Sequence, residues 1–130
     1  MNARTFAMIF GIIFLAVGVL GFGVVPGLLE AQSGSGLQVE GMLLGKFHVN
    51  AAHNIGHLLF GLWGLAASRS TGGAVAYFKA VAVIYALLAI LGLIPATATG
   101  FGLVMLGGMN VYLHAALAVI AAFFGFVRRA

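Results

Sequence analysis

The stretch VNAAHNIGHLLFGLWGLAAS, residues Val49–Ser68, decides what kind of fold this chain adopts. It contains no charged side chain, and it has the length of about 20 residues that an α-helix needs to cross the hydrocarbon core of a membrane. It also carries two histidines and two asparagines, which are costly for a helix surrounded by lipid. The stretch therefore predicts a membrane-spanning helix whose one polar side faces protein or water.

The composition of the whole chain agrees with this interpretation. Of its 130 residues, 63% are hydrophobic and 6% are charged, whereas a soluble domain carries about 25% charged residues. The net charge of +4 comes from six basic residues spread along the chain, so no clustered patch indicates a nucleic-acid partner. The absence of cysteine excludes disulfides and thiolate chemistry.

Three further apolar runs complete the predicted fold. We expect an all-α protein, an antiparallel bundle of four membrane helices in a single membrane domain over residues 1–130. The expected helices cover about residues 6–25, 49–67, 75–94 and 102–127. A signal peptide is the alternative for the first run, but the run exceeds the usual apolar region of about 7–15 residues and no clear cleavage site follows.

The basic residues predict the orientation of these helices. One side of the predicted bundle carries Arg4, Arg69, Lys79, Arg128 and Arg129, and the other carries Lys46 with both acids, Glu30 and Glu40. We therefore expect a multi-pass protein of a bacterial cytoplasmic (inner) membrane with both termini in the cytoplasm. The outer loop, residues 26–48, is compatible with a short hairpin or with a short interfacial helix.

Polar and small side chains recur on one side of the second and fourth predicted helices. At about 100° per residue they fall within a narrow arc on each helix. On the second helix the arc holds Asn50, His53, Asn54, His57, Gly61, Gly64 and Ser68, and on the fourth it holds Gly107, Asn110, His114, Ala118, Ala121 and Gly125. Both arcs are expected to face the inside of the bundle, with His57 and His114 near the bilayer midplane. The first helix offers a small face of Ala7, Gly11 and Gly18, and the third is expected only to pack.

The two halves of the chain are also alike. In each half a plain apolar helix precedes a helix that carries Asn and His. This order suggests a two-plus-two internal repeat.

Three segments together resemble a known family. They are VNAAHNIGHLLFGLWGLAA at Val49–Ala67, YFKAVAVIYALLAILGL at Tyr77–Leu93 and GIIFLAVGVLGF at Gly11–Phe22. The chain resembles an uncharacterised bacterial family of four-helix membrane proteins, a domain of unknown function with an HN-x-x-HL-x-x-G signature. The resemblance implies the fold and the membrane location, but no activity. In that family Asn and His of the fourth helix stand three apart after an acidic residue, whereas here Asn110 and His114 stand four apart after Met109.

The leading interpretation of the polar residues is structural. Hydrogen bonds from His57 to Asn110 and between His114 and Asn54 would satisfy these groups and fix the register of two helices. The protein would then be a structural or accessory subunit, packed against other membrane proteins or against itself. No cofactor is required by this interpretation, and the lack of nucleophile and acid-pair motifs argues against an enzyme.

Two other functions stay open. The candidate ligand residues are Asn50, His53, Asn54, His57, Asn110 and His114. His57 and His114, on facing helices, suit a haem, a chlorin pigment or a metal ion. A metal ion held by the three imidazoles of His53, His57 and His114 is also possible. Proton or small-solute transport by an oligomer is the third possibility, since histidine titrates near neutral pH.

Overall fold

The computed structural model describes residues 2–127, which form four α-helices and a small antiparallel sheet of three strands. In chain order the elements are α1 (Ala3–Leu20), β1 (Leu29–Ser33), β2 (Glu40–Leu43), β3 (Phe47–Asn50), α2 (Ala51–Ala67), α3 (Thr71–Leu93) and α4 (Met109–Ala122). A π-helical turn, Phe123–Val127, continues α4, and single 3₁₀ turns lie at Gly36–Gln38 and Gly100–Gly102. The prediction of an all-α fold is therefore wrong in the loop between α1 and α2, where the strands form.

Three helices among the described residues are long and apolar enough to cross a membrane. They are Ala3–Leu20, Thr71–Leu93 and Met109–Val127, the last of which includes the π-helical turn. This fits a small membrane protein. The helix α2 has 17 residues and carries the polar arc, and its predicted crossing of the membrane stays a prediction.

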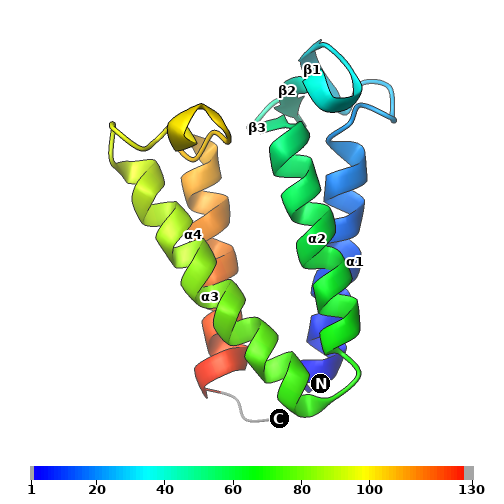
Figure 1. Cartoon of the computed structure of the whole chain (residues 1–130), viewed down its shortest axis with the longest axis vertical. Coiled ribbons are helices and arrows are strands. Elements are labelled where there is room, and N and C mark those ends of the chain that lie inside the picture. Colours follow the sequence, from blue (N-terminus) through cyan, green and yellow to red (C-terminus); the bar gives the residue numbers. More distant parts are fainter. Residues whose placement is uncertain (1, 128–130) are drawn as a thin grey trace.

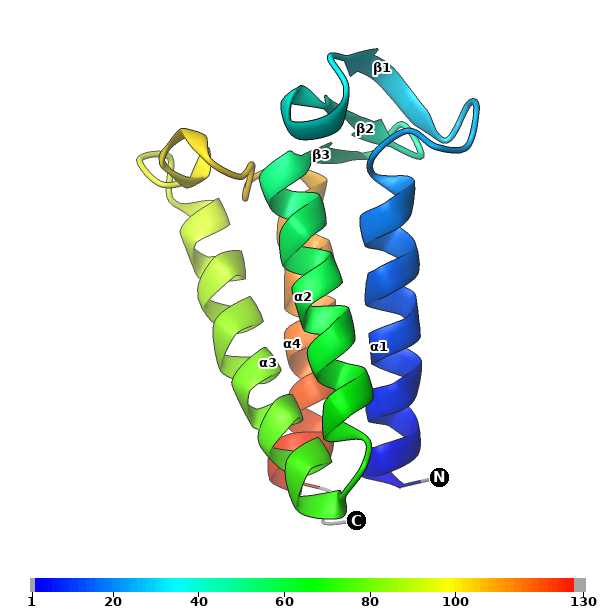
Figure 2. The same cartoon turned by 45° about the vertical axis from the view of Figure 1, so that its right-hand side comes forward.

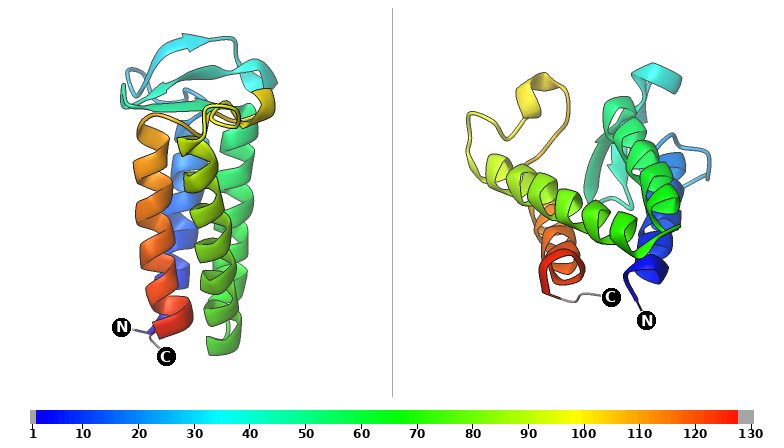
Figure 3. Two further views of the ribbon diagram at one scale, coloured as in Figure 1. Left: turned by 90° about the vertical axis from the view of Figure 1, so that its left-hand side faces the viewer. Right: turned by 60° about the horizontal axis from the view of Figure 1, so that its bottom comes forward.

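The helices associate in two pairs, α1 with α2 and α3 with α4. Figure 1 shows that the pairs are close where α1 begins and diverge toward the sheet. In Figure 2 the sheet covers the far ends of α1 and α2, and in Figure 3 the start of α1 and the end of α4 lie at the same end of the molecule. We call this end the terminal end and the opposite one the sheet end.

Glycines bring α1 and α2 into close contact. A Cβ atom added to Gly11 would lie 2.8 Å from the carbonyl oxygen of Gly61, and one added to Gly64 would lie 2.9 Å from that of Ala7. Such distances leave no room for any side chain, so the two backbones touch. The small faces of α1 and α2 therefore pack against each other.

Aromatic side chains join the two pairs in the half near the terminal end. Phe10 of α1 meets Phe78 of α3 edge-on, with ring centroids 5.1 Å apart. The hydroxyl of Tyr77 donates a hydrogen bond of 3.0 Å to the carbonyl of Phe60 on α2. Tyr77 and Phe78 are fully buried. The pairs are therefore fixed to each other at this end.

Local capping moves two helix boundaries from their predicted places. The helix α1 begins at Ala3 because the Asn2 side chain caps it, accepting a hydrogen bond from the Thr5 amide. The helix α4 begins at Met109 rather than near residue 102, since Gly108 has a positive φ of 66°. The segment before it folds back, and the amide of Leu106 donates to the carbonyl of Ala98 at 2.8 Å.

The sheet has two different faces. Alternate residues of a strand point to opposite faces, and the register pairs Met42 with His48 and Gly41 with Val49. Val49 belongs to the face that is buried against the ends of α1 and α2. The other face carries Glu40, Met42, His48 and Asn50. This polar face is directed toward the loop before α4, since the Asn50 amide donates to the carbonyl of Leu103 at 2.7 Å.

The charged residues are sorted between the two ends of the fold as predicted, as far as the described residues extend. Arg4 lies at the terminal end, where its Nε donates to the carbonyl of Ser68 at 3.0 Å. Lys46 and Glu40 lie at the sheet end. Arg128 and Arg129 lie outside the described residues. Which end faces the cytoplasm stays a prediction.

The internal repeat also stays a prediction. Both halves supply one helix pair. Their connections differ, because a three-stranded sheet joins α1 to α2 while an irregular loop with one 3₁₀ turn joins α3 to α4.

Candidate functional site

Three histidines meet in the space between the two helix pairs. Asn50 caps α2 by accepting a hydrogen bond of 2.9 Å from the His53 amide, which sets where the helix begins and which way its residues face. His53 and His57 follow one turn apart on the buried side of α2, and His114 faces them from α4. Their exposed fractions are 8%, 3% and 1%. The predicted burial of both polar arcs is confirmed except at Asn50, which is half-buried.

We call His53, His57 and His114 the imidazole cluster. The ring centroid of His53 lies 4.3 Å from that of His57 and 6.1 Å from that of His114. Aromatic rings flank the cluster: Phe14 of α1 stacks on His57 at 5.6 Å, and Tyr85 of α3 lies 5.2 Å from His114. All four helices thus contribute to this region.

The predicted hydrogen bonds of His57 with Asn110 and of His114 with Asn54 are not formed. Both polar atoms of the Asn54 amide are buried without a protein partner, and so are Nδ1 of His57 and Oδ1 of Asn110. Asn110 lies in the first turn of α4, where its amide instead donates to the carbonyls of His48 and Met105, at 3.1 and 2.9 Å. The pairing of His57 with Asn110 was wrong because α4 begins seven residues later than the predicted 102.

Asn54 makes no hydrogen bond with His114 in the described part of the chain. Its amide packs against Gly21 at the end of α1, at a place where a Cβ atom would overlap with it. The predicted pairing of Asn54 with His114 is therefore wrong as well.

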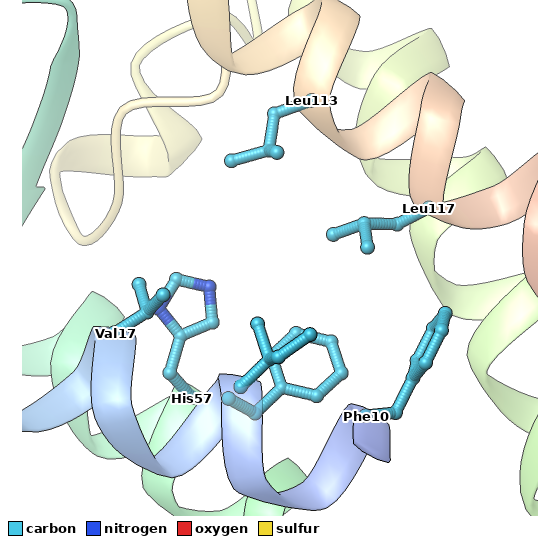
Figure 4. A pocket seen from close by; sticks show the side chains of 7 residues that line it. Phe10, Val17, His57, Leu113 and Leu117 are labelled. Carbon is cyan, nitrogen blue, oxygen red and sulfur yellow. The ribbon is translucent and has the colours of Figure 1, made fainter. Parts of the chain in front are cut away.

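The imidazole cluster borders two cavities. A cavity of about 130 Å³ lies between α2, α3 and the loop before α4, and it is lined by His53, His57, His114 and Tyr85 among mostly apolar residues. A second cavity, of about 90 Å³, lies between α1, α2 and α4. Figure 4 shows the second cavity, with Leu113 and Leu117 facing His57 across it. His57 borders both cavities.

The size of the cavities bears on the ligands considered from the sequence. Pockets for drug-sized molecules measure about 300–1,000 Å³, and both cavities at the cluster are smaller. Binding of a haem or chlorin pigment therefore stays a prediction. Among residues 2–127 no group of three or more His, Asp or Glu side chains is arranged to hold a metal ion. The arrangement instead offers pairs of imidazoles.

The other candidate residues have separate roles. Asn50 is a helix cap that also bonds to the loop before α4, and Asn110 ties that loop to β3. Tyr85 lines the larger cavity together with the histidines, but it was not among the site residues predicted from the sequence. A hydroxyl-bearing aromatic residue in the middle of an apolar span was the signal that could have revealed it.

Comparison with known proteins places the chain in a family but assigns no activity. No curated protein and no solved structure matches it. A family model described as "Domain of unknown function (DUF4383)" matches residues 4–127, nearly the whole chain. The protein therefore belongs to this family of unknown function, as the resemblance implied.

Proposed function

We propose that this small membrane protein binds one transition-metal ion between its two helix pairs, held by the imidazoles of His53 and His114 with His57 beside them. The observation that carries the proposal is a set of buried ring nitrogens without protein partners. They are both nitrogens of His53 and Nδ1 of His57 and His114. A buried polar group without a partner costs about 1–3 kcal/mol, so the cluster is costly unless something binds it.

The spacing of two rings supports coordination of a single ion. A metal ion bound to two imidazoles at about 2.0–2.1 Å per bond separates the ring centroids by about 5 Å at a tetrahedral angle and by about 6 Å when the two ligands are nearly opposite. The centroids of His53 and His114 are 6.1 Å apart. The rings come from different helix pairs, so a shared ion would join α2 to α4.

The charge of the surroundings favours a monovalent ion. Among the described residues no carboxylate lines the cavity beside the cluster, and the cost of moving an ion out of water rises with the square of its charge. Zinc prefers four ligands, whereas copper(I) accepts two. Imidazole is a suitable ligand for copper. We therefore infer copper(I).

The other functions expected from the sequence have less support from the contacts. An accessory role rests on the apolar outer faces of the helices, which suit lipid and partner subunits equally. Transport requires an oligomer, because the cavities at the cluster are small. Residence in a bacterial inner membrane is part of the proposal and agrees with the three span-capable helices.

The test is a metal analysis of the purified protein. Wild type, His114→Leu and the control Tyr112→Phe are loaded with copper(I) under reducing conditions in detergent, separated from free metal and analysed for copper per chain. Tyr112 is two residues from His114 but 71% exposed, so its replacement shows the effect of a change on α4 that leaves the imidazole cluster intact. We expect His114→Leu to bind one equivalent fewer than wild type and Tyr112→Phe to match wild type. Equal copper in wild type and His114→Leu would refute the proposal.

A further inference from the structure

A third cavity, lined by side chains that can bind a metal ion, lies at the sheet end, outside the imidazole cluster. It measures about 250 Å³ and is lined by Met42, Met105, Met109 and His48, together with Lys46, Asn110 and two glycines. Three of the five methionines of the chain thus border one cavity. We call it the methionine pocket.

The fold brings these residues together from three segments. Met42 and His48 are cross-strand partners on β2 and β3, which places their side chains next to each other on the polar face of the sheet. Met105 lies in the loop before α4, and Met109 is the first residue of α4. Asn110 holds the segments together, because its amide donates both to the carbonyl of His48 and to that of Met105.

His48 is oriented as a metal ligand would be. Its Nε2 lies 2.8 Å from Oε2 of Glu40, and a carboxylate accepts a proton rather than donating one, so Nε2 carries the hydrogen. In the neutral ring Nδ1 then has a free lone pair. That atom is buried and has no protein partner. Histidines that bind metals usually donate their other nitrogen to a carboxylate in this way.

The chemistry of the lining selects the ion. Thioether sulfur is a soft ligand that favours copper(I) over harder ions. Oδ1 of Asn110, whose side chain is 1% exposed, is a further unpartnered acceptor beside the pocket. Lys46 also lines the pocket and opposes a cation, but its side chain is exposed, so solvent screens its charge.

The methionine pocket is close to the imidazole cluster. Asn110 borders the pocket and His114 borders the cavity of the cluster. They are one helical turn apart on α4, or about 6 Å along its axis at 1.5 Å per residue. An ion could move between the two sites by exchanging sulfur ligands for nitrogen ligands, with no change in its charge and no proton released.

We propose that the methionine pocket is a second copper(I) site at the membrane surface, formed by the three thioethers and the Nδ1 atom of His48, and that it loads the imidazole cluster. Binding at the pocket stands on its own observations. Only the loading step rests on the proposed function.

The test combines copper(I) titration against a coloured chelator with X-ray absorption at the copper edge. The variant is the triple change Met42→Leu, Met105→Leu and Met109→Leu, which nearly conserves side-chain volume. The control is Met8→Leu, since Met8 lies on α1, 48% exposed and away from the pocket. We expect wild type and Met8→Leu to show copper–sulfur scattering, and the triple variant to lose that scattering and one equivalent of copper.

Two further variants separate the two proposals. Glu40→Gln keeps the shape of the side chain but weakens the acceptor for His48, so the affinity of the pocket should fall about 10–100-fold. His114→Leu should keep the copper–sulfur signal and lose the other equivalent. A wild-type protein without copper–sulfur scattering, or a triple variant that keeps it, would overturn the methionine pocket. Loss of sulfur scattering in the triple variant together with full copper in His114→Leu would overturn the imidazole site alone.

Loading is tested by kinetics. The rate at which the imidazole cluster takes copper(I) from the chelator should be slower in the triple variant than in wild type and Met8→Leu. An equal rate in all three proteins would show that copper reaches the cluster by another route.

Discussion

The side-chain amide of Asn110 donates a hydrogen bond of 3.1 Å to the backbone carbonyl of His48, across 62 residues of sequence. The bond connects the first turn of α4 to strand β3, so it links the second helix pair to the sheet that covers the first. The same amide also donates to Met105 at 2.9 Å. One buried side chain therefore holds the sheet end together, where the helix pairs have diverged (Figure 1).

Replacing Asn110 by Leu should destabilise the protein. Both hydrogen bonds would be lost and two buried carbonyls would lose a donor, at a cost of about 1–3 kcal/mol. Thermal unfolding in detergent measures the effect, with Tyr112→Phe as the control on the exposed side of the same helix. An unchanged melting temperature in Asn110→Leu would show that the tie does not contribute to stability.

Replacing His57 by Leu should leave the metal-free protein at least as stable as wild type. Nδ1 of His57 has no protein partner, so the change removes a buried unsatisfied group and breaks none of the hydrogen bonds found. The measurement is again thermal unfolding, performed after treatment with a chelator. A clear loss of stability would favour the structural interpretation of the histidines.

Two glycines of α2 should respond in opposite ways to alanine. In Gly61→Ala the new methyl group would lie 2.6 Å from Leu15 and 2.8 Å from the backbone of Gly11. Forcing α1 and α2 apart should cost about 1–3 kcal/mol. Gly56→Ala meets nothing within 4 Å and should stabilise the helix by about 0.5–1 kcal/mol. Chemical or thermal unfolding measures the stability of both variants. Equal stability of Gly61→Ala and Gly56→Ala would mean that α1 and α2 do not pack closely.

The orientation in the membrane is tested with reporter fusions. A reporter joined after Ala130 should be active in the cytoplasm, because the basic residues of the terminal end favour that side. The same reporter inserted between Ser35 and Gly36, in the exposed turn of the sheet end, should be inactive because that end is expected to face the periplasm. A periplasmic signal from the C-terminal fusion would reverse the predicted topology.

Several features of the site could be predicted because they follow from local periodicity. On α2 and α4 the residues of the polar arcs recur every three to four positions, and a helix places such residues on one side. In a membrane that side must face protein, which is why His53, His57 and His114 are buried as expected. The close contact of Gly11 with Gly61 follows from the same pattern of small residues.

Other features could not be predicted because they depend on where a helix begins. The polar arc of α4 is the same whether the helix starts near residue 102 or at Met109, but the start decides the depth of Asn110 and the partners within its reach. Gly108, with its positive φ, ends the preceding loop there. The hydrogen bond between His57 and Asn110 was therefore predicted in error.

By itself the sequence determined that the chain belongs in a membrane, that its four apolar segments are largely helical and that His53, His57 and His114 face inward. These properties depend on composition and on spacing along one helix, which solvent and backbone geometry translate directly into structure. Only the tertiary structure decided that the helices form two diverging pairs, that a sheet covers one pair and that Met42, Met105 and Met109 meet beside His48. Many of those contacts join segments that are distant in the sequence, such as those of Met42 and Met105, and their geometry arises from packing between surfaces that no local pattern specifies.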